Sequence, residues 1–387
     1  MNILFLSHTL QPTGAPRVLL NLVEWLHENT EHEMEFLSVE GGALKSAFGR
    51  CGRVHLLSRD WIGSRKSAWS EGLKKLFSAV QGRVVLRRLR SRIGNDKTNR
   101  PIDLVYANTI TLGNVLEWLR LDSTPVLTHV HELESVIGQF GEDNLTLVKK
   151  HTRHYFAASR AVKEQLVQSQ MIPAAKVSVV HEFIRFADSI APRKRLRAEL
   201  NIPADAYVVI GAGIGTWRKG IDLFVDVAAQ MRLRAPGSDI LFVWLGGWDT
   251  PESQTTITDQ VREKGLDGVM RFEGHVDNPL DYFAAADVFA LTSREDPYPL
   301  VCLEAASAGI PVVCFEKAGG MPEFVEHDAG GVVSYLNVAA MADALNLLRC
   351  DLPLRSEFGQ RAAEKVRQRH GVDRAASFLR EKIESIA

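Results

Sequence analysis

The chain has 387 residues and a mass of 43.0 kDa, which corresponds to two or three domains of roughly 150 residues each. Hydrophobic residues make up 45% of the sequence and charged residues 24%, which excludes a disordered chain, collagen or a simple coiled coil. The formal net charge of -1 argues against a general nucleic-acid binder.

The sequence also bounds the compartment. It contains no apolar run of about 18 residues that could span a bilayer, and its first residues lack the features of a signal peptide. The four cysteines are scattered without CxxC spacing. That distribution indicates reduced thiols in a cytoplasmic protein without disulfides or a metal site.

Short apolar segments alternate with amphipathic segments along nearly the whole chain. We predict strands at residues 3–7, 35–38, 104–107, 126–130, 155–158 and 177–181 in the first half, and at residues 207–211, 240–245, 270–273, 288–291, 311–315 and 331–334 in the second. Amphipathic helices are predicted between them, for example at residues 17–27 and 219–229. This alternation predicts an α/β fold with two doubly wound, Rossmann-like parallel sheets.

The strand pattern restarts near residue 205, after a segment that contains Pro192 and several basic residues. We therefore expect a first domain at residues 1–187, a linker at 188–204, a second domain at 205–365 and a C-terminal helix at 366–387 that packs back on the first domain. A ligand is expected in a cleft between the two domains, at the carboxyl ends of their strands.

Residues 64–100 carry eleven Lys or Arg residues against two acids, with apolar residues at helical spacing. The pattern indicates a pair of basic amphipathic helices that would suit an anionic membrane surface, through Arg83, Arg87, Arg88 and Arg90. The alternative is a domain helix with its apolar face in the core and its charges solvated. No nucleic-acid motif accompanies the charge.

Two segments of the second half suggest a phosphate site. The strand predicted at 207–211 ends in glycines, and Arg218 and Lys219 precede the next helix, where they could neutralise a diphosphate. Farther on, the free amides of Leu300 and Val301 at a predicted helix start would attract an anion. The alternative for the first segment is an ordinary helix start with solvated charges.

Two carboxylates, Asp296 and Glu304, flank this predicted helix start. A carboxylate beside a phosphate site can accept two hydrogen bonds from a vicinal diol of a ribose or a hexose. The alternative is that Asp296 caps the helix and Glu304 is solvated. A further strand end leads into the turn at residues 317–323, which contains Gly319, Gly320 and Glu323 and could equally be a simple tight turn.

Together these segments resemble retaining glycosyltransferase family 4 (glycosyl transferases group 1), whose fold is GT-B. That family has two carboxylates separated by seven residues, matched here by Asp296 and Glu304. It also has a Lys-Gly helix start, matched by Lys219 and its following glycine, and a Gly-Gly-x-Pro-Glu turn, matched at 319–323. The resemblance is strongest at residues 205–335.

Two departures from the family pattern affect donor recognition. The first carboxylate is Asp296, one methylene shorter than the family's Glu, and Glu295 stands one residue earlier. Which of the two fills the first carboxylate role stays open. The family often has Arg where this chain has Ile214, and Arg218 is the candidate to supply that charge.

In the first half, the resemblance implies three site residues. Gly14 lies in a segment like the family's glycine loop, which faces the cleft, and His131 matches a histidine that points at the donor sugar in relatives. Asn108 is expected on the acceptor side, and His129 in the core. The alternatives are an ordinary loop and a structural histidine.

The resemblance implies a retaining glycosyltransferase that transfers a hexose from a nucleotide diphosphate sugar to a glycan or lipid-linked acceptor in cell-surface polysaccharide biosynthesis. We expect it to be cytoplasmic and peripheral on the inner face of the membrane, and to need neither metal nor cofactor because no metal-ligand cluster is evident. The implied catalytic residues are His131, Asp296 and Glu295, and the implied donor-binding residues are Gly14, Gly215, Arg218, Lys219, Val276, Tyr298, Leu300, Val301 and Glu304. The rivals are a nucleotide-sugar epimerase of the same fold and a catalytically silent membrane-associated scaffold; a soluble small-molecule acceptor is also open.

Overall fold

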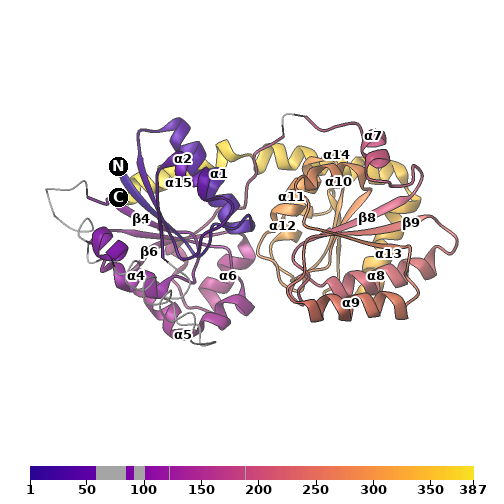
Figure 1. The fold of residues 1–387 in the computed structure, drawn as a ribbon, viewed down its shortest axis with the longest axis horizontal. Helices are drawn as coiled ribbons and strands as arrows, with labels where there is room; N and C mark the ends of the chain where they lie inside the picture. Colours follow the sequence, from indigo (N-terminus) through magenta and orange to yellow (C-terminus); the bar gives the residue numbers. More distant parts are fainter. Residues whose placement is uncertain (58–83, 91–100, 122, 188) are drawn as a thin grey trace, which may run out of the picture. The chain divides into compact units, whose positions relative to one another are not determined.

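A computed structural model describes residues 1–57, 84–90, 101–121, 123–187 and 189–387. These residues form two compact units, the first made of Met1–Phe183 with Val372–Ala387 and the second of Ile184–Gly371. Each unit is one parallel sheet with helices on both faces (Figure 1), as the sequence predicted. No helix among the described residues is long and apolar enough to cross a membrane.

The first sheet has seven parallel strands in the order β3-β2-β1-β4-β5-β6-β7. The strands are β1 (Asn2–Ser7), β2 (Glu33–Ser38), β3 (Arg53–Leu56), β4 (Leu104–Ala107), β5 (Val126–Val130), β6 (Thr152–Ala157) and β7 (Val177–Val179). Sequence analysis missed β3, because this short edge strand has only two apolar residues and none of its residues is buried. The apolar periodicity that identifies a strand is therefore absent there.

The helices of the first unit are α1 (Gly14–Asn29), α2 (Lys45–Cys51), α4 (Gly113–Leu119), α5 (Glu134–His151), α6 (Arg160–Gln168) and α15 (Val372–Ile386), with a short 3-10 turn, η3 (Ala174–Lys176). The last helix, α15, packs beside the first helix, α1 (Figure 1). Trp25 of α1 donates a hydrogen bond from Nε1 to Asp373 Oδ1 at 2.8 Å. The C-terminal helix thus belongs to the same unit as the N-terminal strand and helix.

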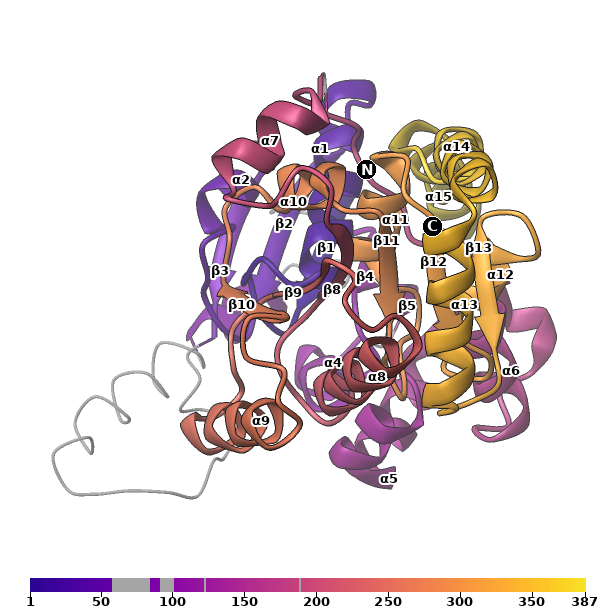
Figure 2. The same cartoon turned by 90° about the vertical axis from the view of Figure 1, so that its right-hand side faces the viewer.

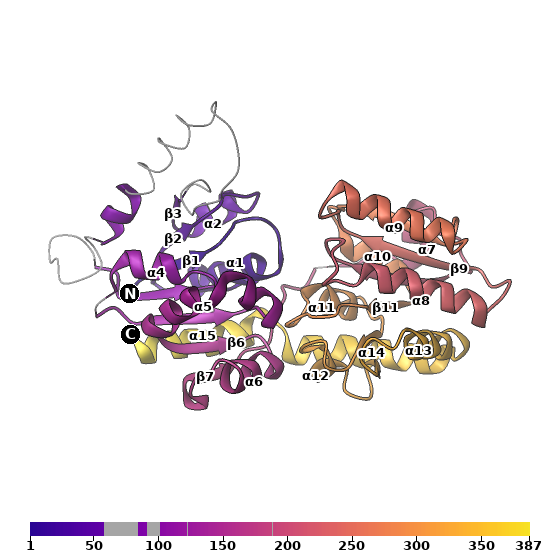
Figure 3. The same ribbon diagram turned by 90° about the horizontal axis from the view of Figure 1, so that it is seen from below.

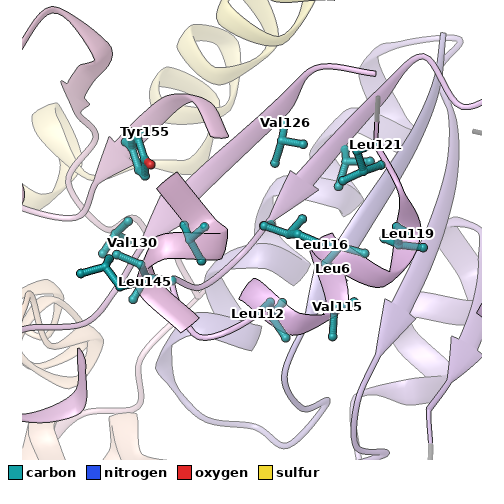
Figure 4. Packing of buried hydrophobic residues seen from close by; sticks show 14 of the residues in the cluster. Leu6, Leu112, Val115, Leu116, Leu119, Leu121, Val126, Val130, Leu145 and Tyr155 are labelled. Carbon is teal, nitrogen blue, oxygen red and sulfur yellow. The ribbon is translucent and has the colours of Figure 1, made fainter. Parts of the chain in front are cut away.

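Leucine and valine side chains fill the space between the first sheet and its helices. Figure 4 shows Leu6 of β1 beside Leu116 of α4, and Val130 of β5 beside Leu145 of α5, all of them buried. Apolar surface removed from water in this way is the main favourable term in folding.

The described part of the basic segment is a helix at residues 84–90. Its Leu86 and Leu89 are buried in the core of the first unit, whereas Arg87 and Arg88 are exposed. This matches the alternative drawn from the sequence, a domain helix with its apolar face in the core and its charges solvated. Arg83 and most of the predicted helix pair lie outside the described residues, and the proposed membrane contact stays a prediction.

The second sheet has six parallel strands in the order β10-β9-β8-β11-β12-β13. The strands are β8 (Tyr207–Ala212), β9 (Ile240–Leu245), β10 (Met270–Gly274), β11 (Val288–Leu291), β12 (Val312–Phe315) and β13 (Gly330–Val333). The helices are α7 (Arg193–Glu199), α8 (Ile221–Arg234), α9 (Pro251–Glu263), α10 (Pro279–Ala285), α11 (Leu300–Ser307), α12 (Met321–Val325), α13 (Val338–Cys350) and α14 (Leu352–Arg369). Helix α14 packs beside α11 (Figure 2), and α8 lies beside α9 (Figure 3).

Residues 188–204, expected as a linker, include α7, which packs on α10. Arg197 of α7 is buried and forms an ion pair with Asp287 at 2.8 Å, and its Nε donates to the carbonyl of Ala285 at 3.0 Å. The basic segment expected as a linker therefore forms a packed helix. Arg197 can be buried in it because its guanidinium is hydrogen-bonded.

Both sheets have one point where the strand order reverses, between β1 and β4 and between β8 and β11. In open parallel sheets, ligands bind outside the carboxyl ends of the strands at such a point. The loops that follow these four strands are therefore where the candidate site residues are to be sought.

Candidate functional site

In the second unit, the loops after β8 and β11 are held together by their backbones. Gly220 adopts φ +66°, and a Cβ there would lie 2.0 Å from the carbonyl oxygen of Thr292. The Thr292 hydroxyl donates to the Gly220 carbonyl at 2.8 Å. Only glycine satisfies both the left-handed conformation and this close approach. Gly220, the glycine of the Lys-Gly helix start, is therefore required by the packing of the two loops.

The two loops meet at an ion pair between the side chains of Lys219 and Asp296. Lys219 Nζ lies 2.5 Å from Asp296 Oδ2, and the two side chains are 16% and 7% exposed. The hydroxyl of Ser293 donates to the same carboxylate oxygen at 3.2 Å. Two residues that the sequence assigned to separate motifs, 77 positions apart, thus form one contact. Burial at this level requires such pairing.

Two arginines fix the conformation of these loops. Arg218 Nη1 donates to the carbonyl of Glu295 at 2.7 Å. Arg294 makes two hydrogen bonds to the carboxylate of Asp222, at 2.8 and 2.5 Å, and lies over the ring of Trp217, 4.9 Å from its centroid. Bidentate pairs of this kind define geometry as well as energy. The sequence reasoning did not single out Arg294 or Asp222.

A third loop, between β12 and α12, lies against Asp296. The amide of Asp296 donates to the carbonyl of Ala318 at 2.6 Å, and the amide of Gly320 donates to the carbonyl of Asp296 at 3.3 Å. Gly319 has φ +134°, and a Cβ there would lie 1.7 Å from the Asp296 carbonyl oxygen. The glycine turn at 319–323 is thus required by the close packing around Asp296.

Helix α11 starts immediately after the Asp296 loop. Leu300 and Val301 are its first two residues, so their amides have no acceptor inside the helix. Glu304 is half-buried on the next turn. A helix start that follows the loop contacted by Lys219 and Arg218 is an arrangement that can bind a diphosphate.

Three other candidates lie elsewhere in this unit. Tyr298 is buried, and its hydroxyl lies 3.3 Å from His370 Nε2, so its side chain belongs to the interior of the unit. At Gly215 a Cβ would approach the ring of Trp248 to 2.8 Å. Val276 is half-buried in the loop after β10. None of these side chains joins the Lys219–Asp296 contact among the interactions of the described residues.

In the first unit, Asn108 and His131 meet at the carboxyl ends of β4 and β5. His131 Nε2 lies 3.0 Å from Asn108 Oδ1, and Asn108 Nδ2 donates to the carbonyl of Ala15 at 2.8 Å. His131 Nδ1 lies 2.6 Å from Glu182 Oε1. The predicted residues of this half are thus joined to each other and to the start of α1, but both ring nitrogens of His131 are engaged within the protein.

Burial governs the ionisation of the histidines at this edge of the sheet. It lowers the pKa of His131 to about 4 and holds the pKa of His129 well below its usual range. His129 is 1% exposed, and its Nδ1 lies 2.8 Å from the hydroxyl of Tyr106. The expectation that His129 belongs to the core is confirmed.

Gly14 is exposed at the first position of α1, and no atom of the described residues lies within 4 Å of a Cβ built there. Packing therefore does not require glycine at this position, and the predicted approach of a ligand there stays a prediction. Among the described residues, no group of three His, Cys, Asp or Glu side chains is placed to hold a metal ion.

Sequence reasoning missed Glu182 and Glu132, two buried carboxylates of the first unit. Glu182 lies 51 residues from His131, after the last strand of the sheet. Glu132 accepts from the amides of His131 and Ile110, at 2.9 and 3.3 Å, and from the hydroxyl of Thr109. No local spacing marks either residue, because only the order of the strands brings their partners together.

Comparison with known proteins finds similarity to glycosyltransferases. Residues 192–365 match the family model described as glycosyl transferases group 1. The lipopolysaccharide core biosynthesis glycosyltransferase LpsE of Rhizobium meliloti (strain 1021) is 30% identical over 170 residues, which are 44% of this chain and 47% of LpsE. D-inositol 3-phosphate glycosyltransferase of Arthrobacter sp. (strain FB24) is 30% identical over 191 residues, 49% of this chain and 45% of that protein. The chain thus spans about half the length of these curated relatives.

Among solved structures, the chain resembles Alr3699/HepE of Anabaena, whose crystal structure holds UDP and glucose. The TM-score is 0.82 at 21% sequence identity, and the comparison covers 100% of both chains. The fold is therefore that of the GT-B glycosyltransferase structures, as the sequence predicted.

Proposed function

We propose that this chain, whose residues 192–365 match the family model described as glycosyl transferases group 1, is a glycosyltransferase that uses a nucleotide diphosphate sugar. The observation that carries the proposal is the contact between Lys219 and Asp296, which joins the loops after β8 and β11 inside the matched region. It lies at the strand-order reversal, the position where parallel sheets bind nucleotides.

The proposal assigns the diphosphate to Lys219, Arg218 and the first amides of α11. As the sugar leaves, negative charge develops on the diphosphate, and fixed cations and amide dipoles stabilise that charge. Lys219 is paired with Asp296. A bound diphosphate would offer Lys219 a second anion, and Asp296 would then be available to hydroxyls of the donor sugar.

Glu304 is assigned to the hydroxyls of the ribose, and either Asp296 or Glu295 to the first carboxylate role. The contacts favour Asp296, because it faces Lys219, whereas Glu295 contributes its backbone carbonyl to Arg218. His131 is assigned to the donor sugar and Asn108 to the acceptor side. Gly14, Gly215 and Val276 would allow the close approach of substrate to the backbone.

For the reaction, we propose retention of configuration. The bond between the anomeric carbon of a hexose and the diphosphate oxygen breaks, and the acceptor oxygen bonds to the anomeric carbon on the same face. The acceptor's proton passes to the leaving phosphate oxygen, so neither a metal nor an enzymic nucleophile is needed. Activity that persists in excess chelator would support this part, and loss restored by Mn²⁺ or Mg²⁺ would contradict it.

The proposed acceptor is a glycan or a lipid-linked sugar of cell-surface polysaccharide biosynthesis. The similarity to LpsE, a glycosyltransferase of lipopolysaccharide core biosynthesis, supports this class. We propose that the protein works in the cytoplasm as a peripheral protein on the inner face of the membrane, through the basic segment that includes Arg87 and Arg88. A soluble acceptor would remove the need for that contact.

The test is a panel of nucleotide sugars, incubated with and without lipid-linked acceptors, in which nucleotide release and sugar transfer are measured together. The proposal expects acceptor-dependent release of nucleoside diphosphate and a glycosylated product, both absent in a Lys219→Ala control. An epimerase would convert the donor sugar without acceptor and without a glycosylated product. A silent scaffold would do neither with any donor, and either result would overturn the proposal.

A further inference from the structure

Four groups from distant parts of the first unit form one chain of hydrogen bonds. Glu182 lies beyond β7, His131 follows β5, Asn108 follows β4, and Ala15 begins α1. The distances are 2.6 Å from Glu182 Oε1 to His131 Nδ1, 3.0 Å from His131 Nε2 to Asn108 Oδ1, and 2.8 Å from Asn108 Nδ2 to the Ala15 carbonyl. All three side chains are almost fully buried.

The protons of this chain follow from its acceptors. A backbone carbonyl only accepts, so the Asn108 amide nitrogen must face Ala15, and its oxygen must face His131. His131 Nε2 therefore carries a hydrogen and donates it to Asn108. The remaining contact, between His131 Nδ1 and Glu182 Oε1, joins two atoms that each accept when deprotonated. One proton must lie between them for a contact at 2.6 Å to be favourable.

This shared proton fixes the histidine. Asn108 holds only Nε2, and burial lowers the pKa of His131 to about 4, so without a second partner Nδ1 would be buried and unsatisfied. With Glu182 in place, the pair has zero net charge whichever atom holds the proton, so it can stay buried at low cost. The neighbouring Glu132 does not compete, because its oxygens accept from backbone amides and a threonine hydroxyl.

We propose that Glu182 is a positioning residue for sugar transfer: it shares a proton with His131 Nδ1 and, together with Asn108, holds the ring in one orientation with Nε2–H directed at Asn108. The proposal rests on the proposed function in that His131 is the group that serves the reaction. Glu182 itself does not touch the substrate. A carboxylate that orients a functional histidine in this way sets its tautomer and its direction.

The first experiment needs no activity. In the full chain labelled with ¹⁵N-histidine, long-range ¹⁵N–¹H spectra report the protonation of each ring nitrogen. For His131 we expect a protonated Nε2 in the wild type and in Glu182→Gln. In the Gln variant the side-chain amide donates to Nδ1, so this nitrogen should move to the shift of a fully unprotonated nitrogen. A control, Glu134→Gln on the exposed start of α5, should leave the spectrum unchanged. Because the shared proton can lie on either atom, the decisive variant is Glu182→Ala, which leaves Nδ1 without its donor. Wild-type His131 shifts in Glu182→Ala overturn the proposal.

The second experiment measures transfer by Glu182→Ala and Glu182→Gln in protein whose thermal unfolding matches that of the wild type. We expect kcat to fall about 10- to 100-fold in the Ala variant, with partial recovery in the Gln variant and little change in nucleoside diphosphate affinity. Wild-type kcat in Glu182→Ala, alongside an inactive His131→Ala, overturns the positioning role.

Full activity in His131→Ala would overturn the role of His131 in the proposed function, and the positioning role with it. The spectra distinguish the two failures. A changed His131 signal in Glu182→Ala with an active His131→Ala shows that the coupling exists but does not serve transfer. An unchanged signal shows that the coupling itself is absent.

Discussion

The side chains at the two strand-order reversals of this molecule differ in charge. At the second, full charges meet: Lys219 pairs with Asp296, and Arg218 and Arg294 hold the surrounding loops. At the first, Glu182, His131 and Asn108 form a buried polar chain with one shared proton and no net charge.

This difference in charge determines what each region can do in a reaction. A charged, partly exposed pair can exchange one anion for another, which suits a site that binds and releases a diphosphate. A buried neutral chain cannot change partners without leaving a polar group unsatisfied, which costs about 1–3 kcal/mol per group. It is therefore suited to hold one side chain in a fixed direction.

The largest effect is expected from removing the charges of the second region. Arg218→Ala with Lys219→Ala should abolish transfer, because neither the departing diphosphate nor Asp296 would retain its cation. A residual rate below about 1% of wild type in an acceptor-transfer assay is expected, with the fold intact by circular dichroism. Arg232→Ala with Lys264→Ala, two cations elsewhere on the same unit, is the matched control. Transfer retained in the first double variant would sink the diphosphate assignment.

A smaller effect should separate the two carboxylates of the second region. Glu304→Gln removes a charged acceptor from the ribose and should weaken nucleoside diphosphate binding roughly ten- to hundredfold, as expected for about 1.5–3 kcal/mol. Asp296→Ala should leave that affinity nearly level and act on the sugar. Calorimetry with the bare nucleoside diphosphate compares them, and the reverse ranking would exchange their assigned roles.

The smallest effect per residue is expected at the exposed arginines of the helix at 84–90. Arg87→Glu with Arg88→Glu should weaken binding to anionic vesicles, because each cation near such a surface contributes about 1 kcal/mol. Flotation with phosphatidylserine vesicles measures it, with neutral vesicles as the control. If the wild type does not float with anionic vesicles, the lipid-linked acceptor loses its support.

The sequence predicted both sheets and the residues of the second region because their signals are local. Eleven of the thirteen strands are short apolar runs between turn residues, and Lys219 and Asp296 stand at strand ends next to glycine turns. The strand β7 was also found, but three residues long where five were predicted. Edge strand β3 escaped detection because it is half exposed and has no apolar alternation.

The partners within each region could not be predicted in the same way. Lys219 and Asp296 are far apart in sequence, and only the neighbouring positions of β8 and β11 join them. Glu182 follows a short strand at the sheet edge, with no glycine turn or helix start to mark it. Its role depends on the His131 ring at the end of another strand, which no spacing encodes. The helix α7 was hidden for a similar reason, since its buried Arg197 finds Asp287 only in the fold.

The most direct test of the different roles of the two regions is calorimetric titration of a nucleoside diphosphate into wild type, Lys219→Ala and His131→Ala. The account predicts that binding is lost or weakened at least tenfold in Lys219→Ala, because the loss of a charge-assisted contact costs about 1.5–3 kcal/mol. It predicts wild-type affinity in His131→Ala, whose transfer rate is nevertheless reduced. Equal affinity for the nucleotide in wild type and Lys219→Ala would contradict the central claim that the second unit's charged pair is the diphosphate site.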